Sequence, residues 1–210
     1  GLGDVYKRQV GSNLINLLII KTNYNIISID NYSSGSKKNH IKSKRVKYLR
    51  GDTKDIFHLL KKPYEINAIF HFGEFARIYQ SFPKMNECIN SNTIGSNAVF
   101  NFCLKNNIKL IYSATSANLG NKGNDKNLSP YAFTKAKNLE LLENLKKWFN
   151  FKYEVIYFYN VYGPNQICEG KMATVIGIFE NCFKKNKPLP VVKPGNQTRR
   201  FTHINDCLLY

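Results

Sequence analysis

A tyrosine and a lysine four residues apart are the side chains of this 210-residue chain best suited to proton transfer. Ser129-Pro130 is typical of a helix start, because serine caps the free amides of the first turn and proline tolerates the first helical position. On a helix that begins there, Tyr131 and Lys135 lie on one face. A lysine ammonium one turn from a phenol favours the phenolate and lowers its pKa toward the working pH.

A strand end rich in hydroxyl groups precedes this helix. Leu110-Ile111-Tyr112 predicts a buried parallel strand, and Ser113 and Thr115 follow it. Ligands of open α/β sheets bind at the carboxyl ends of strands, so we expect Thr115 to share a site with the tyrosine and lysine. The spacing Tyr-x-x-x-Lys alone is weak evidence, because a half-exposed aromatic beside a solvated lysine is common on helices.

The elements that must position this site alternate along the chain. Apolar runs predict strands, and longer periodic segments between them predict helices. This alternation predicts an α/β fold with a doubly wound parallel sheet, Rossmann-like in its layers. The predicted strands are residues 25–30, 46–49, 67–72, 110–112 and 153–159, and the predicted helices are residues 14–20, 54–61, 85–106, 130 onward and 172–183.

Composition limits the remaining possibilities. A net charge of +17 permits nucleic acid, an anionic membrane or phosphorylated ligands as partners. The lysines are scattered, and no basic stripe interleaved with aromatics stands out, so a solvated surface is favoured and nucleic acid is unexpected. Five widely spaced cysteines without a Cys-x-x-Cys pair predict reduced thiols in a cytoplasmic protein and no metal site. No apolar run reaches the ~20 residues of a membrane span.

The Ser-Ala-Thr-Ser run at residues 113–116, followed by Tyr131 and Lys135, resembles the extended short-chain dehydrogenase/reductase family, the NAD-dependent nucleotide-sugar epimerases and dehydratases. The resemblance runs from Gly11 to Asp206. It implies that Tyr131 as phenolate removes a sugar hydroxyl proton while hydride passes to NAD. It also implies that Lys135 contacts the nicotinamide ribose and that Thr115 hydrogen-bonds the reacting hydroxyl.

The same resemblance assigns the cofactor contacts. Of the family's Gly-x-x-Gly-x-x-Gly turn, only the last glycine has a counterpart, Gly11. Asp30, about 20 residues further on, would accept the adenosine ribose hydroxyls and repel a 2′-phosphate, which favours NAD over NADP. The other implied cofactor contacts are Asn31, Asp52, Phe72 and Gly73. The next residues, Glu74-Phe75-Ala76-Arg77, depart from the family's small-residue run.

Two further matches concern the substrate. Asn160-Val161-Tyr162-Gly163-Pro164 resembles a family loop whose asparagine contacts the sugar diphosphate. Arg199 matches an arginine that contacts the nucleotide diphosphate, a role suited to a guanidinium. The resemblance divides the chain into a cofactor-binding domain at residues 10–165, lacking its first strand, and the beginning of a smaller C-terminal substrate domain at residues 166–210. It also implies a homodimer and a chain truncated at both ends.

The first nine residues do not fit the family pattern. Asp4 to Gln9 is the translation of a common transposon sequencing adapter. We expect residues 1–9 to be a non-native artefact.

The predicted activity is 4-epimerisation of a UDP-sugar through a keto intermediate. The family's dehydratases place a glutamate two residues after the site threonine, whereas Ser116 and Ala117 follow Thr115 here. The alternatives are a reductase, synthase or dehydratase of the same family, a non-catalytic member, and a nucleic-acid-binding member.

Overall fold

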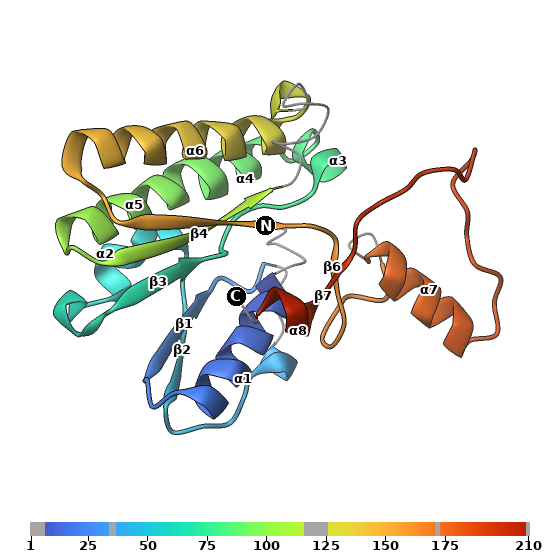
Figure 1. The fold of residues 1–210 in the computed structure, drawn as a ribbon, viewed down its shortest axis with the longest axis horizontal. Helices are drawn as coiled ribbons and strands as arrows, with labels where there is room; N and C mark the ends of the chain where they lie inside the picture. The colour runs from blue at the N-terminus through green and yellow to red at the C-terminus, as the bar shows by residue number, and fades with distance from the viewer. Residues whose placement is uncertain (1–6, 34–36, 116–125, 171–172, 209–210) are drawn as a thin grey trace.

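The computed structural model describes residues 7–33, 37–115, 126–170 and 173–208. It contains parallel strands, and α-helices form the crossovers from β3 to β4 and from β4 to β5, the usual connection between parallel strands. Figure 1 shows the sheet between helices on both faces. The strands are β1 (Ile26–Asp30), β2 (Val46–Arg50), β3 (Ala68–His71), β4 (Lys109–Thr115), β5 (Tyr153–Phe158), β6 (Val161–Tyr162) and β7 (Thr202–His203).

The helices follow the predicted order, and their ends differ from the predicted ones by a few residues. The predicted helix at residues 54–61 is reduced to a 3₁₀ turn and one short α-helix, and the predicted helix at residues 85–106 contains a π-helical turn at Asn90–Gly95. The helices are α1 (Ser12–Lys21), α2 (Ile56–Leu59), α3 (Ile78–Ser81), α4 (Met85–Ile89), α5 (Ser96–Lys105), α6 (Pro130–Phe149), α7 (Val175–Lys184) and α8 (Ile204–Cys207).

Two apolar clusters, one on each side of the sheet, confirm the doubly wound architecture. The larger joins α2, α5 and α6 to β4 through buried side chains such as Phe102, Leu110 and Leu142. The smaller lies toward α1 and α8 and contains Phe158 and Ile204. Burial of these side chains is the main source of stability, at about 25 cal/mol per Å² of apolar surface.

The core strands fall into two hydrogen-bonded groups. β1 pairs with β2, and β4 lies between β3 and β5. Among the described residues, no strand pairs with both β1 and β3, so no strand links the two groups by hydrogen bonds. The register places Ala68 opposite Lys109 and Thr115 opposite Phe158, so that β3, β4 and β5 direct their carboxyl ends to one edge of the sheet.

The last segment of the chain extends away from this sheet. β6 and β7 form a separate parallel pair, and α7 lies beyond them at the right of Figure 1. The side chains of residues 183–201 are all exposed. The predicted boundary at residue 165 falls between β6 and α7, and the division into two domains stays a prediction.

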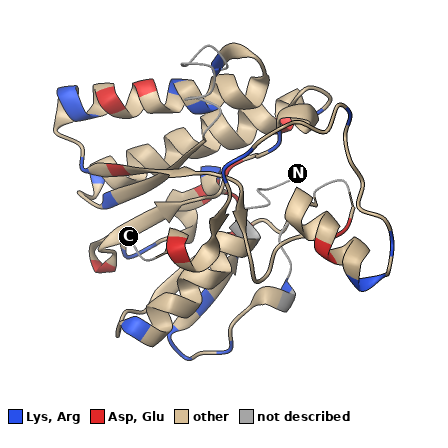
Figure 2. Ribbon diagram, turned by 45° about the vertical axis from the view of Figure 1, so that its right-hand side comes forward, with Lys and Arg blue, Asp and Glu red and all other residues tan. Residues whose placement is uncertain are grey.

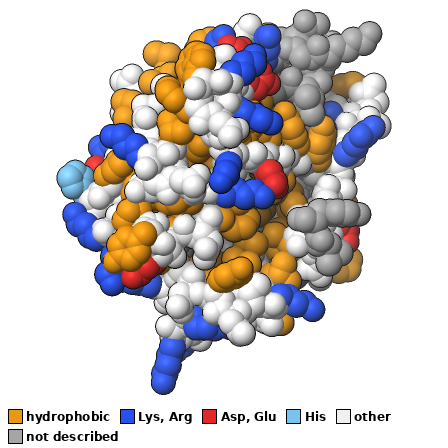
Figure 3. All heavy atoms as spheres, turned by 60° about the vertical axis from the view of Figure 1, so that its left-hand side comes forward, with side chains coloured by type: hydrophobic (Ala, Val, Ile, Leu, Met, Phe, Trp, Pro, Cys, Tyr) orange, Lys and Arg blue, Asp and Glu red, His pale blue; other side chains and the backbone are white. Residues whose placement is uncertain are grey.

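Surface charge has the scattered distribution expected from the sequence. Figure 2 shows Lys and Arg as separated segments spread over the ribbon, and Figure 3 shows them dispersed among apolar and uncharged side chains on one face. The five cysteines are free. Within the described ranges, no helix is long and apolar enough to cross a membrane, and no cluster of His, Cys, Asp and Glu could hold a metal ion.

Candidate active site

Helix α6 begins where the sequence predicts and carries both proton-transfer candidates. Ser129 caps it by accepting a hydrogen bond from the Ala132 amide at 3.1 Å, and Pro130 is its first residue. Tyr131 therefore lies in the first turn, and Lys135 lies in the next. β4 ends at Thr115, partly exposed, at the edge of the sheet beneath this helix.

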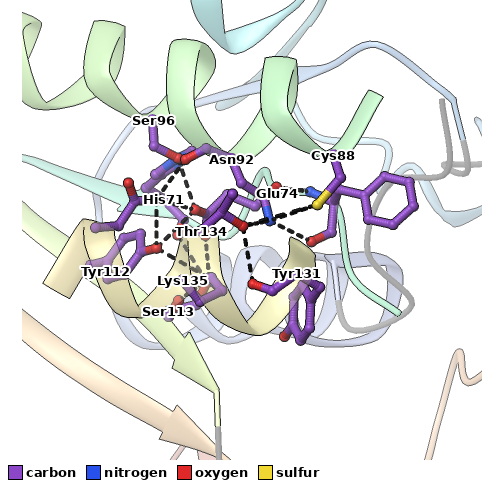
Figure 4. A network of polar contacts seen from close by, with 12 residues as sticks. His71, Glu74, Cys88, Asn92, Ser96, Tyr112, Ser113, Tyr131, Thr134 and Lys135 are labelled. Carbon is purple, nitrogen blue, oxygen red and sulfur yellow. Dashed lines mark hydrogen bonds and ion pairs between the residues drawn. The ribbon is translucent and has the colours of Figure 1, made fainter. Parts of the chain in front are cut away.

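The Lys135 ammonium lies next to the carboxyl-terminal end of β4. It donates to the Glu74 carboxylate and to the Ser113 carbonyl, and it lies 3.4 Å from the Tyr112 hydroxyl. It also lies 4.5 Å from the centre of the Tyr112 ring, a favourable cation–π position. The lysine is only 2% exposed. Figure 4 shows the lysine, the glutamate and their neighbours as one network.

Glu74 lies at the centre of this network although it follows the end of β3. Its Oε2 atom faces Lys135, and three neutral donors surround its Oε1 atom. These are the hydroxyls of Ser96 and Tyr112, both at 2.8 Å, and the Asn138 amide at 3.0 Å. His71 approaches the same group indirectly, with Nε2 2.9 Å from the Ser96 hydroxyl. Donors on three elements, β4, α5 and α6, thus converge on one buried carboxylate.

The environment keeps this glutamate ionised. Burial by itself raises the pKa of Glu74, but the charges of Lys135 and His71 and the hydrogen bonds from Lys135 and Ser96 outweigh it, so the pKa lies below its ordinary value. Burial, together with the nearby Glu74 charge, raises the pKa of Tyr112 well above its ordinary value. Tyr112 therefore stays a neutral phenol that donates to the glutamate.

Asn92, in the π-helical turn, fixes the chain just after Glu74. Its side-chain oxygen accepts from the Phe75 amide at 2.5 Å, and its nitrogen donates to the Phe75 carbonyl at 3.0 Å and to the Thr134 hydroxyl at 3.2 Å. These contacts tie the π-helical turn to the backbone that follows Glu74. Gly95, at the end of the π turn, permits close packing, because a Cβ there would overlap the Thr53 hydroxyl.

Three predicted cofactor contacts, Asp30, Asn31 and Asp52, lie at the ends of β1 and β2. Asp30 accepts a hydrogen bond from the Tyr32 amide at 2.7 Å through one carboxylate oxygen. The Asn31 amide donates to Asp52 at 3.1 Å, which joins the two strand ends. Two carboxylates and an amide beside one another, at the edge where ligands of such sheets bind, fit a group rich in hydroxyls such as the adenosine ribose of NAD.

The predicted pyrophosphate turn has a different form. Lys7–Gly11 is a π-helical turn that continues into α1, and Gly11 has right-handed helical dihedrals, φ −61° and ψ −48°. Gly11 therefore lies within a helical run, and the described residues form no open glycine turn there. A Cβ at Gly11 would meet nothing within 4 Å, so a ligand could approach its backbone. The role of Gly11 stays a prediction.

Of the other predicted contacts, some lie at the carboxyl ends of the sheet strands and others lie in segments near the C-terminus. Phe72 is buried edge-on against the ring of Phe158, and Gly73 follows it at the end of β3. Asn160 donates to the Arg200 carbonyl at 2.8 Å, which ties the end of β5 to the approach of β7. Arg199 is exposed and donates to the neighbouring Thr198 carbonyl at 2.8 Å. Ser116 and Ala117 lie outside the described residues.

Sequence reasoning missed the residues that surround Lys135. It noted Glu74 only as a departure from the family run, and it assigned no role to Tyr112, Ser96 or Asn138. One signal was present: a carboxylate two residues after the predicted strand at 67–72, between Gly73 and Phe75, needs a partner if it is buried. His71, to which the sequence assigned no chemistry, is a buried member of the network.

Comparisons with known proteins agree with this geometry. The profile of the NAD dependent epimerase/dehydratase family matches residues 7–208. A putative UDP-glucose 4-epimerase of Methanocaldococcus jannaschii is 25% identical over 208 residues, which cover 94% of this chain and 67% of that protein. The chain thus belongs to the NAD-dependent epimerase/dehydratase family of enzymes, as the resemblance predicted.

Solved structures give the same fold. UDP-glucose 4-epimerase from Thermotoga maritima, solved with UDP-glucose, has a TM-score of 0.82 at 24% identity and is matched over 95% of this chain and 67% of its own. A dTDP-glucose 4,6-dehydratase from Streptomyces venezuelae has the same TM-score at 19% identity, with 95% of this chain and 66% of its own covered. The chain spans about two thirds of the length of such relatives.

Proposed function

We propose that this chain is the larger part of an NAD-dependent nucleotide-sugar epimerase that inverts a hydroxyl-bearing carbon, most simply carbon four of a UDP-sugar, through a keto-sugar. The observation that carries the proposal is the placement of Tyr131 and Lys135. They lie one turn apart on α6, with the lysine ammonium buried under the strand that ends at Thr115.

In this proposal each side chain has one task. Tyr131 as phenolate takes the proton of the sugar hydroxyl, and Thr115 holds that hydroxyl by a hydrogen bond. Lys135 presents the ammonium end of its ion pair with Glu74 to the phenolate. Bound NAD would supply a reversible hydride acceptor, with Asp30, Asn31 and Asp52 holding its adenosine end. The substrate's diphosphate would contact Asn160 and Arg199.

Among the described residues, the carboxylate that contacts Lys135 is unsuited to dehydration, and this favours epimerisation. Elimination of water needs an acid–base group that exchanges protons with the sugar. Glu74 is 1% exposed, is paired with Lys135, and has a pKa below its ordinary value. It therefore stays a carboxylate bound to the lysine and does not supply that acid.

The test is incubation with NAD and a panel of UDP-, GDP- and dTDP-sugars, with products followed by chromatography and proton NMR. Both residues 1–210 and the longest chain that the source gene encodes should be assayed. Interconversion of a UDP-hexose with its 4-epimer, abolished in Tyr131→Phe, supports the proposal. A 4-keto-6-deoxy product, or steady consumption of NADH, would identify the dehydratase or reductase alternative instead.

A further inference from the structure

The Glu74 carboxylate has no part in the sequence pattern or in the steps of the proposed reaction. It is buried, ionised and bound by donors from β4, α5 and α6. A buried charge is costly unless it is paired and hydrogen-bonded, so such a group persists where its environment compensates it fully. The question is what this carboxylate does for Lys135.

The contacts of Lys135 hold its ammonium in place next to the carboxyl-terminal end of β4. Glu74 accepts from it on one side, the Ser113 carbonyl accepts on another, and the Tyr112 hydroxyl and ring lie against it. Glu74 in turn cannot move away, because Asn92 binds both backbone groups of the next residue, Phe75. The lysine is therefore fixed in position by a carboxylate that is itself fixed.

The charge of the pair follows from the same contacts. A lone ammonium beside Tyr131 would favour the phenolate strongly, whereas an ammonium bonded to a carboxylate presents a nearly neutral pair to the phenol. The other titratable groups that act on the pair are His71 on β3, Tyr112 on β4 and Cys88 on α4, and Tyr131 lies one turn before Lys135 on α6. Cys88 and Tyr112 have pKa values raised by burial and stay neutral near pH 7.

We propose that Glu74 is a positioning residue that holds Lys135 in place as a buried ion pair and cancels most of its charge, so that Tyr131 works beside a pair rather than beside a lone cation. The inference rests on the proposed function for its catalytic meaning. The ion pair and its effect on the tyrosine can be measured without substrate.

The first experiment titrates Tyr131 directly. The protein is labelled with tyrosine carrying ¹³C at the ring carbon that bears oxygen, and the Tyr131 resonance is assigned as the one lost in Tyr131→Phe. In Glu74→Gln, which keeps the shape and an acceptor, we expect the Tyr131 pKa to fall by about one unit, the order that one nearby charge produces. An unchanged or higher Tyr131 pKa would overturn the proposal.

The second experiment tests the ion pair by thermal unfolding of Glu74→Gln, Lys135→Met and the double variant. Lys135→Met leaves a buried carboxylate without its cation, so we expect a melting temperature several degrees below that of the double variant. A double variant no more stable than Lys135→Met would overturn the proposal, and this comparison remains valid if Glu74→Gln alone fails to fold.

The matched control is an exposed pair on neighbouring strands. Lys109 and Glu154 lie 2.5 Å apart on β4 and β5, and their side chains are 47% and 63% exposed. Lys109→Met and Glu154→Gln should therefore have nearly additive effects. Neither experiment uses a sugar. A chain inactive toward every nucleotide sugar would contradict the proposed function, whereas the Tyr131 titration and the unfolding measurements would still test the role of Glu74.

Discussion

Asn92 offers a prediction whose size follows from its contacts. Its side-chain amide binds the amide and the carbonyl of Phe75, a residue that is 2% exposed. Asn92→Leu keeps a similar volume and leaves both backbone groups buried without these partners. Each unsatisfied group costs about 1–3 kcal/mol, so the free energy of unfolding should fall by about 2–6 kcal/mol. For a chain of this length that is a drop in melting temperature of roughly 4–24 °C.

The assay is urea unfolding followed by far-UV circular dichroism, with the denaturant slopes compared to check that both variants unfold alike. Asn101→Leu is the control, because Asn101 bonds only locally to Asn97 on the exposed side of α5 in the described contacts. It should change stability by less than about 0.5 kcal/mol. A loss below about 1 kcal/mol in Asn92→Leu would refute the view that this amide fixes the chain behind Glu74.

Three further predictions concern charge and burial. The Glu74 pKa lies below its ordinary value of 4.5, so the stability that the Glu74 carboxylate contributes is present above that pH and is lost as the pH falls through the folded-state pKa. Glu74→Gln should therefore reduce the dependence of the free energy of unfolding on acid pH by up to about 1.4 kcal/mol per pH unit. An unchanged pH dependence would contradict this. Burial raises the pKa of Cys88 to about 11 and of Cys103 to about 12. When native protein is treated with iodoacetamide at pH 8 and analysed by peptide mass spectrometry, neither thiol should be modified. Modification as fast as in unfolded protein would disprove their burial. Asp30→Ser should improve binding of NADP relative to NAD by about tenfold, measured by calorimetry, because it removes a charge that repels the 2′-phosphate; an unaltered ratio would place the ribose elsewhere.

Local signals in the sequence were sufficient for most of the fold. The hydroxyl–proline pair Ser129-Pro130 fixes the start of α6 through its own side chain and ring, so the positions of Tyr131 and Lys135 could be predicted. Apolar runs located the core strands within a few residues. The π-helical turn at Asn90–Gly95 could not be predicted, because it depends on tertiary contacts of Asn92 and on the close approach of Thr53 to Gly95.

The network around Lys135 could not be found from spacing. Glu74, Tyr112 and Asn138 are far apart in the chain and meet only because β3, β4 and α6 adjoin in space. The helical setting of Gly11 was likewise missed, since a single glycine before an apolar segment is compatible with a turn and with a helical run. Pattern matching located the residues that resemble a family, whereas the residues that surround Lys135 needed the three-dimensional structure.

The most direct test of the proposed function is the fate of the sugar hydrogens during turnover in heavy water, observed by proton NMR. Epimerisation removes a hydride from carbon four and returns it to the opposite face, so the product should carry no deuterium from solvent at any carbon, and Tyr131→Phe should give no product. Deuterium at carbon five would show that a proton was removed there, as elimination of water requires, and would contradict the epimerase account.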